Sequence, residues 1–587
     1  MTPTKWIRTR RRILALATSG RKRTAACLAA LMAGFTAPLV GQLPADSVRR
    51  IDEIFAAFDH TDTPGCVVGA DRGGRPLFRR AYGMANLELG VPLTIESVLE
   101  TGSVAKQFVA GSIVSLATSG ALGLDDPIRR YLPELPERDP PVTIRMLLNH
   151  TGDIRELWAL FAMAGLPVGS VAFTMDQALA LLLRQRGGDF APNSRYAYSN
   201  GGYVLLAEIV KRASGRSLAD YGRTTFFEPL GMRATQWRDD WNRVVPSRAT
   251  AYRPAGTGFR IDMPITSVHG NGGLLTTIGD LLVWNEQLAH PRVGGAGWTD
   301  SLERTGRLTS GRELEYALGL RVTTYRGQRE VSHFGNTASY WSYLGRFPEI
   351  GLSVAILCNH GGADAPGLAR QMIDLLLPAG SPPAPTIRIP PGAPGVTAYA
   401  GRYRDPNTED LIDIAIRDGF LVQQRLGRTV PLTLLGAGRY GWDAAIYGQA
   451  SRPMALAFAE PVAGRAPKVT LTTPDGGPAE YVRVAPPRSS AAELTHYAGV
   501  YHGDELAADY RIRSTGTALT LEVVGVGRLP EDLGGPVLTL TRNATDAFGD
   551  AGGLTVRFTR GSGRVTGFLL HFHGAMISGI RFRREGP

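Results

Sequence analysis

Lysine is scarce in this chain, although basic residues are not. Only five of the 64 basic residues are lysines, namely Lys5, Lys22, Lys106, Lys211 and Lys468. A guanidinium cannot give up its proton in a protein, whereas a buried ammonium can. A chain that otherwise uses arginine therefore has a chemical reason to keep a lysine where an amine must lose its proton. Lys106, three residues after Ser103 in "ETGSVAKQF", is the candidate for such a place.

Cysteine is also scarce, with three residues in 587. There is no C-x-x-C pair and no H-E-x-x-H motif, so the sequence predicts no zinc or other metal site and no cofactor. Cys66 and Cys358 lie in the strand-like runs "PGCVVGA" and "LSVAILCN". We interpret them as two buried thiols in preference to a disulfide, and neither has the electropositive, helix-start setting of a nucleophilic thiol.

Acidic residues are missing from the first 45 positions. This segment holds eight basic residues, and the first acid is Asp46, so the rest of the chain carries a net charge of only about +3. That value does not favour a nucleic-acid partner. The basic start and the apolar run "AACLAALMAGFTAPLVG" are typical of a signal segment over residues 1–45. We expect a protein exported to the periplasm or secreted, with membrane contact only through the leader if it is not cleaved.

The rest of the sequence divides by composition. Residues 46–378 mix helical and strand patterns, and the simplest arrangement is an antiparallel sheet built from both ends of the region with a helical insert between. A Pro-rich linker, 379–395, follows. Short strands then dominate, and "VTAYAGRY" is repeated as "LTHYAGVY" 98 residues later. We predict an α+β fold: one helix-flanked sheet domain, then two all-β barrel-like domains at 396–485 and 494–587.

Three short motifs bring chemistry to the first domain. Ser103 and Lys106 share one helix face at i and i+3, where the amine can reach the hydroxyl and the helix start favours an oxyanion. "RYAYSNGGY" supplies Tyr198 and Asn200 on a turn before a helix. "SHFGNT" supplies His333, Gly335 and Asn336 on a strand. The order of the three motifs, Ser-x-x-Lys, then Tyr-x-Asn, then a basic residue-x-Gly, indicates a catalytic site far more specifically than any single motif does.

With these motifs, residues 50–375 resemble the penicillin-binding protein and class C β-lactamase superfamily of serine hydrolases. "GALGLDDPIRRYLPE", "VTIRMLLNHTGDI" and "HGNGGLLTTIGDLLVWNEQL" are further landmarks of the resemblance. It implies that Ser103 is the nucleophile and that Lys106 and Tyr198 share acid and base work, with the base left open between them. It implies that Asn200 binds the substrate amide, that His333 and Gly335 line the substrate site, and that the N–H groups of Ser103 and Asn336 form the oxyanion hole. In this family the histidine of "LLNHTG", His150, is a structural turn feature.

His333 departs from the lysine of the usual β-lactamase. A histidine is charged only part of the time near neutral pH, which suits a substrate carboxylate less well. The His-x-Gly form resembles D-amino-acid aminopeptidases and esterases. Those aminopeptidases also carry β-barrel domains after the catalytic one, and in them a barrel loop can enter the site. The resemblance therefore implies hydrolysis of a small-molecule or short-peptide amide or ester through an acyl-serine.

Two alternatives remain open at this point. One is a promiscuous carboxylesterase or β-lactamase of the same fold. The other is a catalytically silent protein that binds cell-wall peptides or β-lactams, which the complete set of Ser103, Lys106 and Tyr198 disfavours. An α/β-hydrolase is excluded by the lack of a G-x-S-x-G motif.

Overall fold

The computed structural model describes residues 43–382 except 167, and 396–586 except 418–419, 426–427, 437, 443–453, 473–477, 486, 488, 525–536 and 551. Residues 1–42 of the leader and 383–395 of the Pro-rich linker lie outside the described residues. Among the helices of the described part, none is long and apolar enough to cross a membrane.

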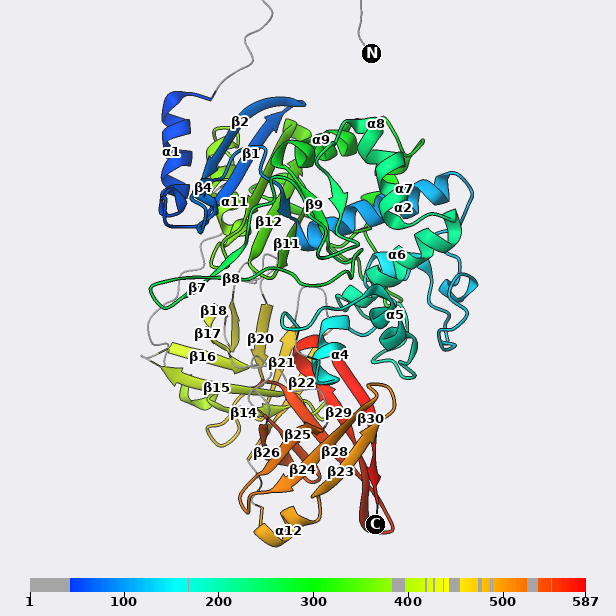
Figure 1. Ribbon diagram of the computed structural model, residues 1–587. Helices are drawn as coiled ribbons and strands as arrows, with labels where there is room; N and C mark the ends of the chain where they lie inside the picture. The colour runs from blue at the N-terminus through cyan, green and yellow to red at the C-terminus, as the bar shows by residue number, and fades with distance from the viewer. Residues whose placement is uncertain are drawn as a thin grey trace, which may run out of the picture. The chain divides into compact units, whose positions relative to one another are not determined.

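A six-stranded antiparallel sheet forms the centre of the first domain (Figure 1). Its order is β10-β11-β12-β13-β1-β2, with bounds Arg321–Tyr325, Gln328–Thr337, Tyr340–Phe347, Leu352–Cys358, Cys66–Arg72 and Arg75–Tyr82. Strands from the two ends of the domain thus pair at β13 and β1, which agrees with the predicted arrangement. Alternate residues of β1 face opposite sides of the sheet. Val68 packs with helices α1 (Ala45–Phe55) and α11 (Ala365–Leu376) on one side. Val67 belongs to the core on the other side, with α9 (Ile278–Ala289).

The interpretation of Cys66 and Cys358 as separate thiols is wrong. They form a disulfide that joins β1 to β13, where the two residues are direct partners in the antiparallel register. They are 292 positions apart in the sequence, so only the strand pairing reveals that they face each other.

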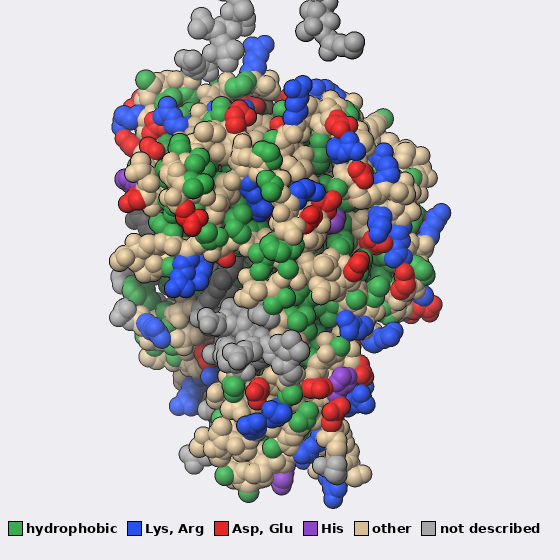
Figure 2. All heavy atoms as spheres, in the orientation of Figure 1, with side chains coloured by type: hydrophobic (Ala, Val, Ile, Leu, Met, Phe, Trp, Pro, Cys, Tyr) green, Lys and Arg blue, Asp and Glu red, His purple; other side chains and the backbone are tan. Residues whose placement is uncertain are grey.

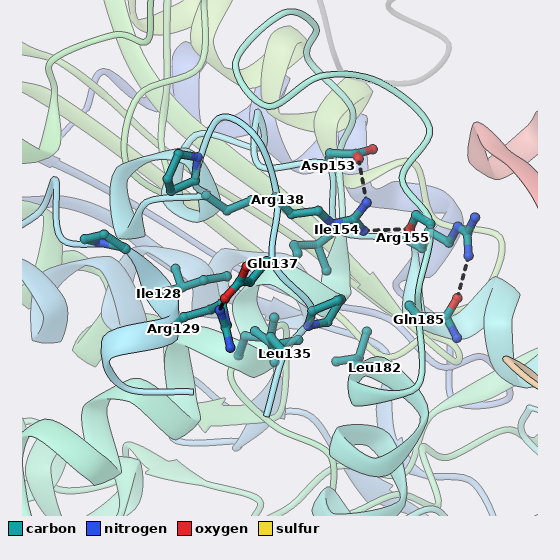
Figure 3. Close-up of a pocket in the computed structure, with 16 residues that line it drawn as sticks. Ile128, Arg129, Leu135, Glu137, Arg138, Asp153, Ile154, Arg155, Leu182 and Gln185 are labelled. Carbon is teal, nitrogen blue, oxygen red and sulfur yellow. Dashed lines mark hydrogen bonds and ion pairs between the residues drawn. The ribbon is translucent and has the colours of Figure 1, made fainter. Parts of the chain in front are cut away.

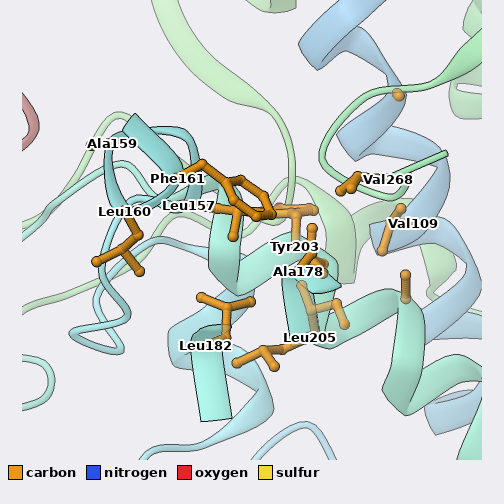
Figure 4. Packing of buried hydrophobic residues seen from close by; sticks show 14 of the residues in the cluster. Val109, Leu157, Ala159, Leu160, Phe161, Ala178, Leu182, Tyr203, Leu205 and Val268 are labelled. Carbon is orange, nitrogen blue, oxygen red and sulfur yellow. The ribbon is translucent and has the colours of Figure 1, made fainter. Parts of the chain in front are cut away.

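The insert between β2 and β10 is mainly helical. Its central helices, α2 (Lys106–Thr118) and α6 (Asn200–Ser214), are buried over most of their length and begin at residues predicted for the site. Figure 4 shows Tyr203 and Leu205 of α6 near apolar residues of α4 and α5, such as Leu157 and Leu182. The other helices are α3 (Ile144–Leu148), α4 (Leu157–Met163), α5 (Met175–Leu183), α7 (Leu218–Gly222), α8 (Glu228–Leu230) and α10 (Trp298–Leu302). Short strands complete the insert: β3 (Met84–Asn86), β4 (Val91–Pro92), β5 (Leu99–Glu100), β6 (Gln236–Trp237), β7 (Tyr252–Ala255), β8 (Gly258–Ile261) and β9 (Leu274–Thr276).

Two barrel-like antiparallel sheets follow, as the repeat predicts. The first is nine-stranded, in the order β17-β16-β15-β14-β22-β21-β20-β19-β18. Its strands are β14 (Gly401–Arg404), β15 (Leu411–Arg417), β16 (Phe420–Arg425), β17 (Arg428–Pro431), β18 (Thr433–Gly436), β19 (Arg439–Trp442), β20 (Met454–Phe458), β21 (Lys468–Thr472) and β22 (Ala479–Val484). The second is a closed barrel, preceded by α12 (Ala491–Thr495). Its strands are β23 (Gly499–Gly503), β24 (Ala508–Ser514), β25 (Leu519–Val524), β26 (Leu538–Ala544), β27 (Ala547–Gly549), β28 (Leu554–Gly561), β29 (Arg564–Phe572) and β30 (Ile577–Glu585).

The repeated tyrosines have one structural role in both sheets. The hydroxyl of Tyr403 donates to the carbonyl of Tyr399 at 2.8 Å, and that of Tyr501 donates to the carbonyl of Tyr497 at 2.7 Å. Both acceptors are the first tyrosine of their repeat, and both donors are fully buried. The repeated tyrosines therefore belong to the core at the start of each of the two sheets, and their role there is structural.

Charged side chains of both signs are interspersed over the described surface in the view of Figure 2. This mixture agrees with the small net charge of the chain beyond the leader.

Candidate active site

Ser103 lies at the junction of a short helical turn and the central sheet. It is the second residue of the 3₁₀ turn η2 (Gly102–Ala105), which leads directly into α2, and it is partly exposed. Gly102 has a φ of +50°, and a Cβ there would lie 2.6 Å from the backbone nitrogen of Asn336 on β11. A glycine is therefore required for the turn to approach the strand so closely.

Lys106 is completely buried beneath Ser103. Its Nζ lies 3.0 Å from Ser103 Oγ, 2.9 Å from Asn200 Oδ1 and 2.6 Å from the carbonyl oxygen of Asn271. Burial lowers the pKa of Lys106 well below its usual value, and the Glu156 carboxylate opposes that shift. The structure thus brings together the predicted nucleophile and an amine that is readily neutral.

Tyr198 packs over the same amine, with Nζ of Lys106 4.8 Å from the centre of its ring. Burial raises the pKa of Tyr198, and a side-chain hydrogen bond with Ser103 pulls it back in part. The phenol is therefore protonated in the resting site. Tyr198 belongs to an aromatic wall that also contains Tyr196 and Tyr316.

Asn200 connects the lysine to a carboxylate that the motif analysis did not include. It is the first residue of α6, and its Nδ2 donates to Oε1 of Glu156 at 2.7 Å. The other oxygen of Glu156 accepts from the backbone N–H of Ala159 at 2.8 Å, which caps α4. Both ends of the Asn200 amide are thus engaged, and its orientation follows from these bonds.

His333 is buried, and with its pKa lowered to about 3 its ring is neutral near pH 7. Its Nε2 lies 2.9 Å from the hydroxyl of Tyr316 and its Nδ1 lies 2.6 Å from the carbonyl oxygen of Phe334. The second contact requires a proton on Nδ1, so Nε2 accepts the Tyr316 proton. Burial and, to a lesser extent, the protonated form of Lys106 lower the pKa of His333 to about 3. Its ring lies 6.4 Å from the ring of Tyr198.

Gly335 and Asn336 lie on β11 against the turn that carries Ser103. A Cβ at Gly335 would lie 2.0 Å from the carbonyl oxygen of Thr101 and 2.6 Å from the backbone nitrogen of Ser103. This contact explains the glycine of the His-x-Gly motif in steric terms. The side chain of Asn336 donates to Ala338 and Tyr340, which leaves its backbone as the part that borders the nucleophile.

His150 supports the site, in addition to its place in a turn. Its ring lies 4.2 Å from the ring of Tyr198 and 4.7 Å from that of Tyr316, and its Nδ1 accepts the backbone N–H of Ser199 at 3.1 Å. Burial lowers the pKa of His150 well below its usual value. Sequence reasoning also missed Glu156, whose only signal was a carboxylate shortly after "LLNHTGDI".

One cluster of metal-ligand type occurs among the described residues, and it lies in the closed barrel. Ligand atoms of His502, Asp509 and Glu585 come within 4.8 Å of one another. His502 already contacts Asp509 through Nδ1 at 2.5 Å and Asp504 through Nε2 at 3.2 Å. These contacts are those of a surface ion-pair group, and none of its residues is part of the Ser103 site.

Known proteins resemble this chain in sequence and in fold. The Beta-lactamase family model matches residues 51–377. The chain is 25% identical to a D-aminopeptidase of Brucella anthropi over 78% of this chain and 82% of that protein. It is 30% identical to penicillin-binding protein 4* of Bacillus subtilis over 50% of this chain and 68% of that one. Its fold is similar to that of the octameric penicillin-binding protein homologue from Pyrococcus abyssi, with a TM-score of 0.51, 23% identity, and coverage of 74% and 98%.

Proposed function

The chain belongs to the β-lactamase family of serine hydrolases, and from this premise we propose that it cleaves amides or esters through an acyl-serine at Ser103. The buried amine of Lys106, 3.0 Å from Ser103 Oγ, is the observation that carries the proposal. The preferred substrates are small amides or short peptides that contain D-amino acids.

Lys106 is the base in this mechanism. A neutral amine has two N–H donors and one lone pair. The amide oxygen of Asn200 and the carbonyl oxygen of Asn271 accept the two donors, and the lone pair is left for the hydroxyl proton of Ser103. Ser103 Oγ then attacks the carbonyl carbon, and the N–H groups of Ser103 and Asn336 stabilise the oxyanion.

Tyr198 is the acid toward the leaving group. Its raised pKa keeps the phenol protonated, so it delivers a proton to the departing amine or alkoxide, and Lys106 returns a proton to it. In deacylation the roles reverse, and the same groups activate water.

The charges near Ser103 favour a substrate with a free amino group. Burial raises the pKa of Glu156, which is bonded to Asn200 beside Lys106, and an ammonium nearby would stabilise its charged form. His333, neutral by burial, provides no fixed charge for a substrate carboxylate. The D-aminopeptidase relatives add support for D-amino-acid amides.

Export is part of the proposal. The leader has the composition of a signal segment, and the Cys66–Cys358 disulfide is of the kind that persists in oxidising compartments.

The test is hydrolysis of p-nitrophenyl acetate by the protein and by its Ser103→Ala variant, followed by D- and L-alanine p-nitroanilide and nitrocefin. We expect a burst of nitrophenol that the variant lacks, and faster turnover of the D-anilide than of the L-anilide. Equal release by both proteins would contradict an acyl-serine. Preference for nitrocefin would replace the aminopeptidase specificity with that of a β-lactamase.

A further inference from the structure

The closed barrel contacts the catalytic domain one residue away from Glu156. The turn between β23 and β24 brings Glu505 to Arg155, with Oε2 2.5 Å from Nη1. The two side chains are only 9% and 1% exposed. From the same barrel, the carbonyl of Ser578 accepts from Nη2 of Arg155 at 2.9 Å.

The same turn also holds the segment that precedes Tyr198. The carbonyl of Glu505 accepts from Nε2 of Gln185 at 3.0 Å, and its Oε2 accepts from the backbone N–H of Arg186 at 3.0 Å. The backbone N–H of Ser578 donates to Oδ1 of Asp189 at 2.7 Å. Two segments of the catalytic domain, 153–156 and 185–189, are therefore held by the β23–β24 turn and by the start of β30 of the barrel.

Arg155 is connected to the active site in two ways, through its own carbonyl and through the next residue, Glu156. Its carbonyl accepts from Oγ of Ser199 at 3.2 Å, and Ser199 is the N-cap of α6. The next residue, Glu156, accepts from Asn200, which in turn accepts from Lys106. A displacement of Arg155 would therefore move both the start of α6 and the carboxylate that orients Asn200.

Core packing alone does not hold this segment. A cavity of about 300 Å³ lies against Asp153, Ile154 and Arg155, and Figure 3 shows Arg155 turned toward Gln185 at its edge. A segment beside an open pocket is not packed on all sides, so contacts other than close packing contribute to its position. The charged contacts with the barrel thus take a larger share in fixing Arg155.

We propose that Glu505 of the closed barrel is a positioning residue for catalysis, which acts through Arg155 and Glu156 on Asn200 and Lys106. The proposal rests on the proposed function, because its effect is measured as acylation of Ser103. The hydrolase then needs the barrel for full activity, although no group of the barrel contacts the reacting atoms in this mechanism.

The test is a double-mutant cycle on the acylation rate with p-nitrophenyl acetate, using Glu505→Gln, Glu156→Gln and both together. We expect Glu505→Gln to slow acylation by about 10- to 100-fold, since a displacement of about 1 Å has effects of this size. The double variant should be within about threefold of the slower single variant, because both changes act on Asn200. Effects that multiply would show that the barrel does not act through Glu156.

Two further variants separate positioning from general stability. Asp546→Asn breaks another ion pair of the same barrel, with Arg560, and should lower the thermal midpoint without slowing acylation. Arg155→Lys keeps the charge but cannot reach both Glu505 and Ser578, so its rate should lie between those of the protein and Glu505→Gln.

The outcomes also separate this inference from the proposed function. If the unmodified protein shows no acylation that depends on Ser103, the proposed function fails. If it acylates normally and Glu505→Gln acylates at the same rate, the proposed function stands and the positioning role of Glu505 is refuted.

Discussion

Acidification is expected to destabilise this protein through His333. Burial lowers the pKa of His333 to about 3, against about 6.5 in an unfolded chain, so between these values the unfolded state binds the proton and the folded state does not. The stabilisation is complete above pH 6.5 and is lost as the pH falls through 6.5 toward 3. Between pH 7 and pH 5 the loss amounts to about 2 kcal/mol in the free energy of unfolding.

The assay is urea unfolding of the protein and of His333→Gln at pH 7, 6 and 5. Glutamine has no proton to gain in this range, and its amide can still meet the hydroxyl of Tyr316. A buried histidine that His333 does not influence, such as His571, whose pKa is also lowered, contributes equally in both proteins. The contribution of His333 is therefore the difference between the two pH dependences.

We expect the loss of stability from pH 7 to pH 5 to be about 2 kcal/mol smaller in His333→Gln than in the unmodified protein. His290→Gln, at a surface position where the side chain is 75% exposed, controls for the exchange of a histidine for glutamine. Parallel pH dependences for the protein and His333→Gln would refute the neutral, buried state of His333.

Three other changes have defined outcomes. Lys106→Arg should slow acylation by about 10²- to 10⁴-fold because the base of the proposed mechanism is lost. Lys211→Arg, at an exposed position, should not slow it. Near-normal turnover by Lys106→Arg would contradict the base role. Gly335→Ala should slow acylation by about 10²- to 10³-fold, since its Cβ would displace the backbone that we propose as the oxyanion hole. Gly279→Ala fits without contact closer than 3.9 Å and serves as the control for the rate measurement. Reduction of the Cys66–Cys358 disulfide should lower the free energy of unfolding by about 2–4 kcal/mol. The measurement is urea unfolding with and without dithiothreitol, and an unchanged midpoint would contradict a stabilising role of the disulfide.

The sequence predicted those parts of the molecule that depend on local order along the chain. Ser103 and Lys106 are one helical turn apart, and the structure places Nζ and Oγ in contact as the i, i+3 spacing requires. The repeat likewise predicted two barrel-like sheets, because each copy opens with the same Tyr-x-Gly-x-Tyr entry.

The features that the sequence did not reveal depend on pairing between distant segments. The bond between Cys66 and Cys358 follows from the register of β1 and β13, which no local pattern specifies. The neutral state of His333 follows from its burial, and its residue type alone suggested a partly charged ring. The link from Glu505 to Arg155 spans 350 positions and becomes visible only when the barrel and the helical insert are in contact.

The pairing of β1 with β13 has a consequence for biosynthesis. The middle of the central sheet is a seam between the first and the last strands of the catalytic domain, and some 280 residues are synthesised between them. Contacts so distant in the sequence form slowly, and β1 keeps an unpaired edge until its partner has been made. We therefore expect the nascent chain to need protection from aggregation until residue 358 has emerged, after which the seam closes and the disulfide locks it.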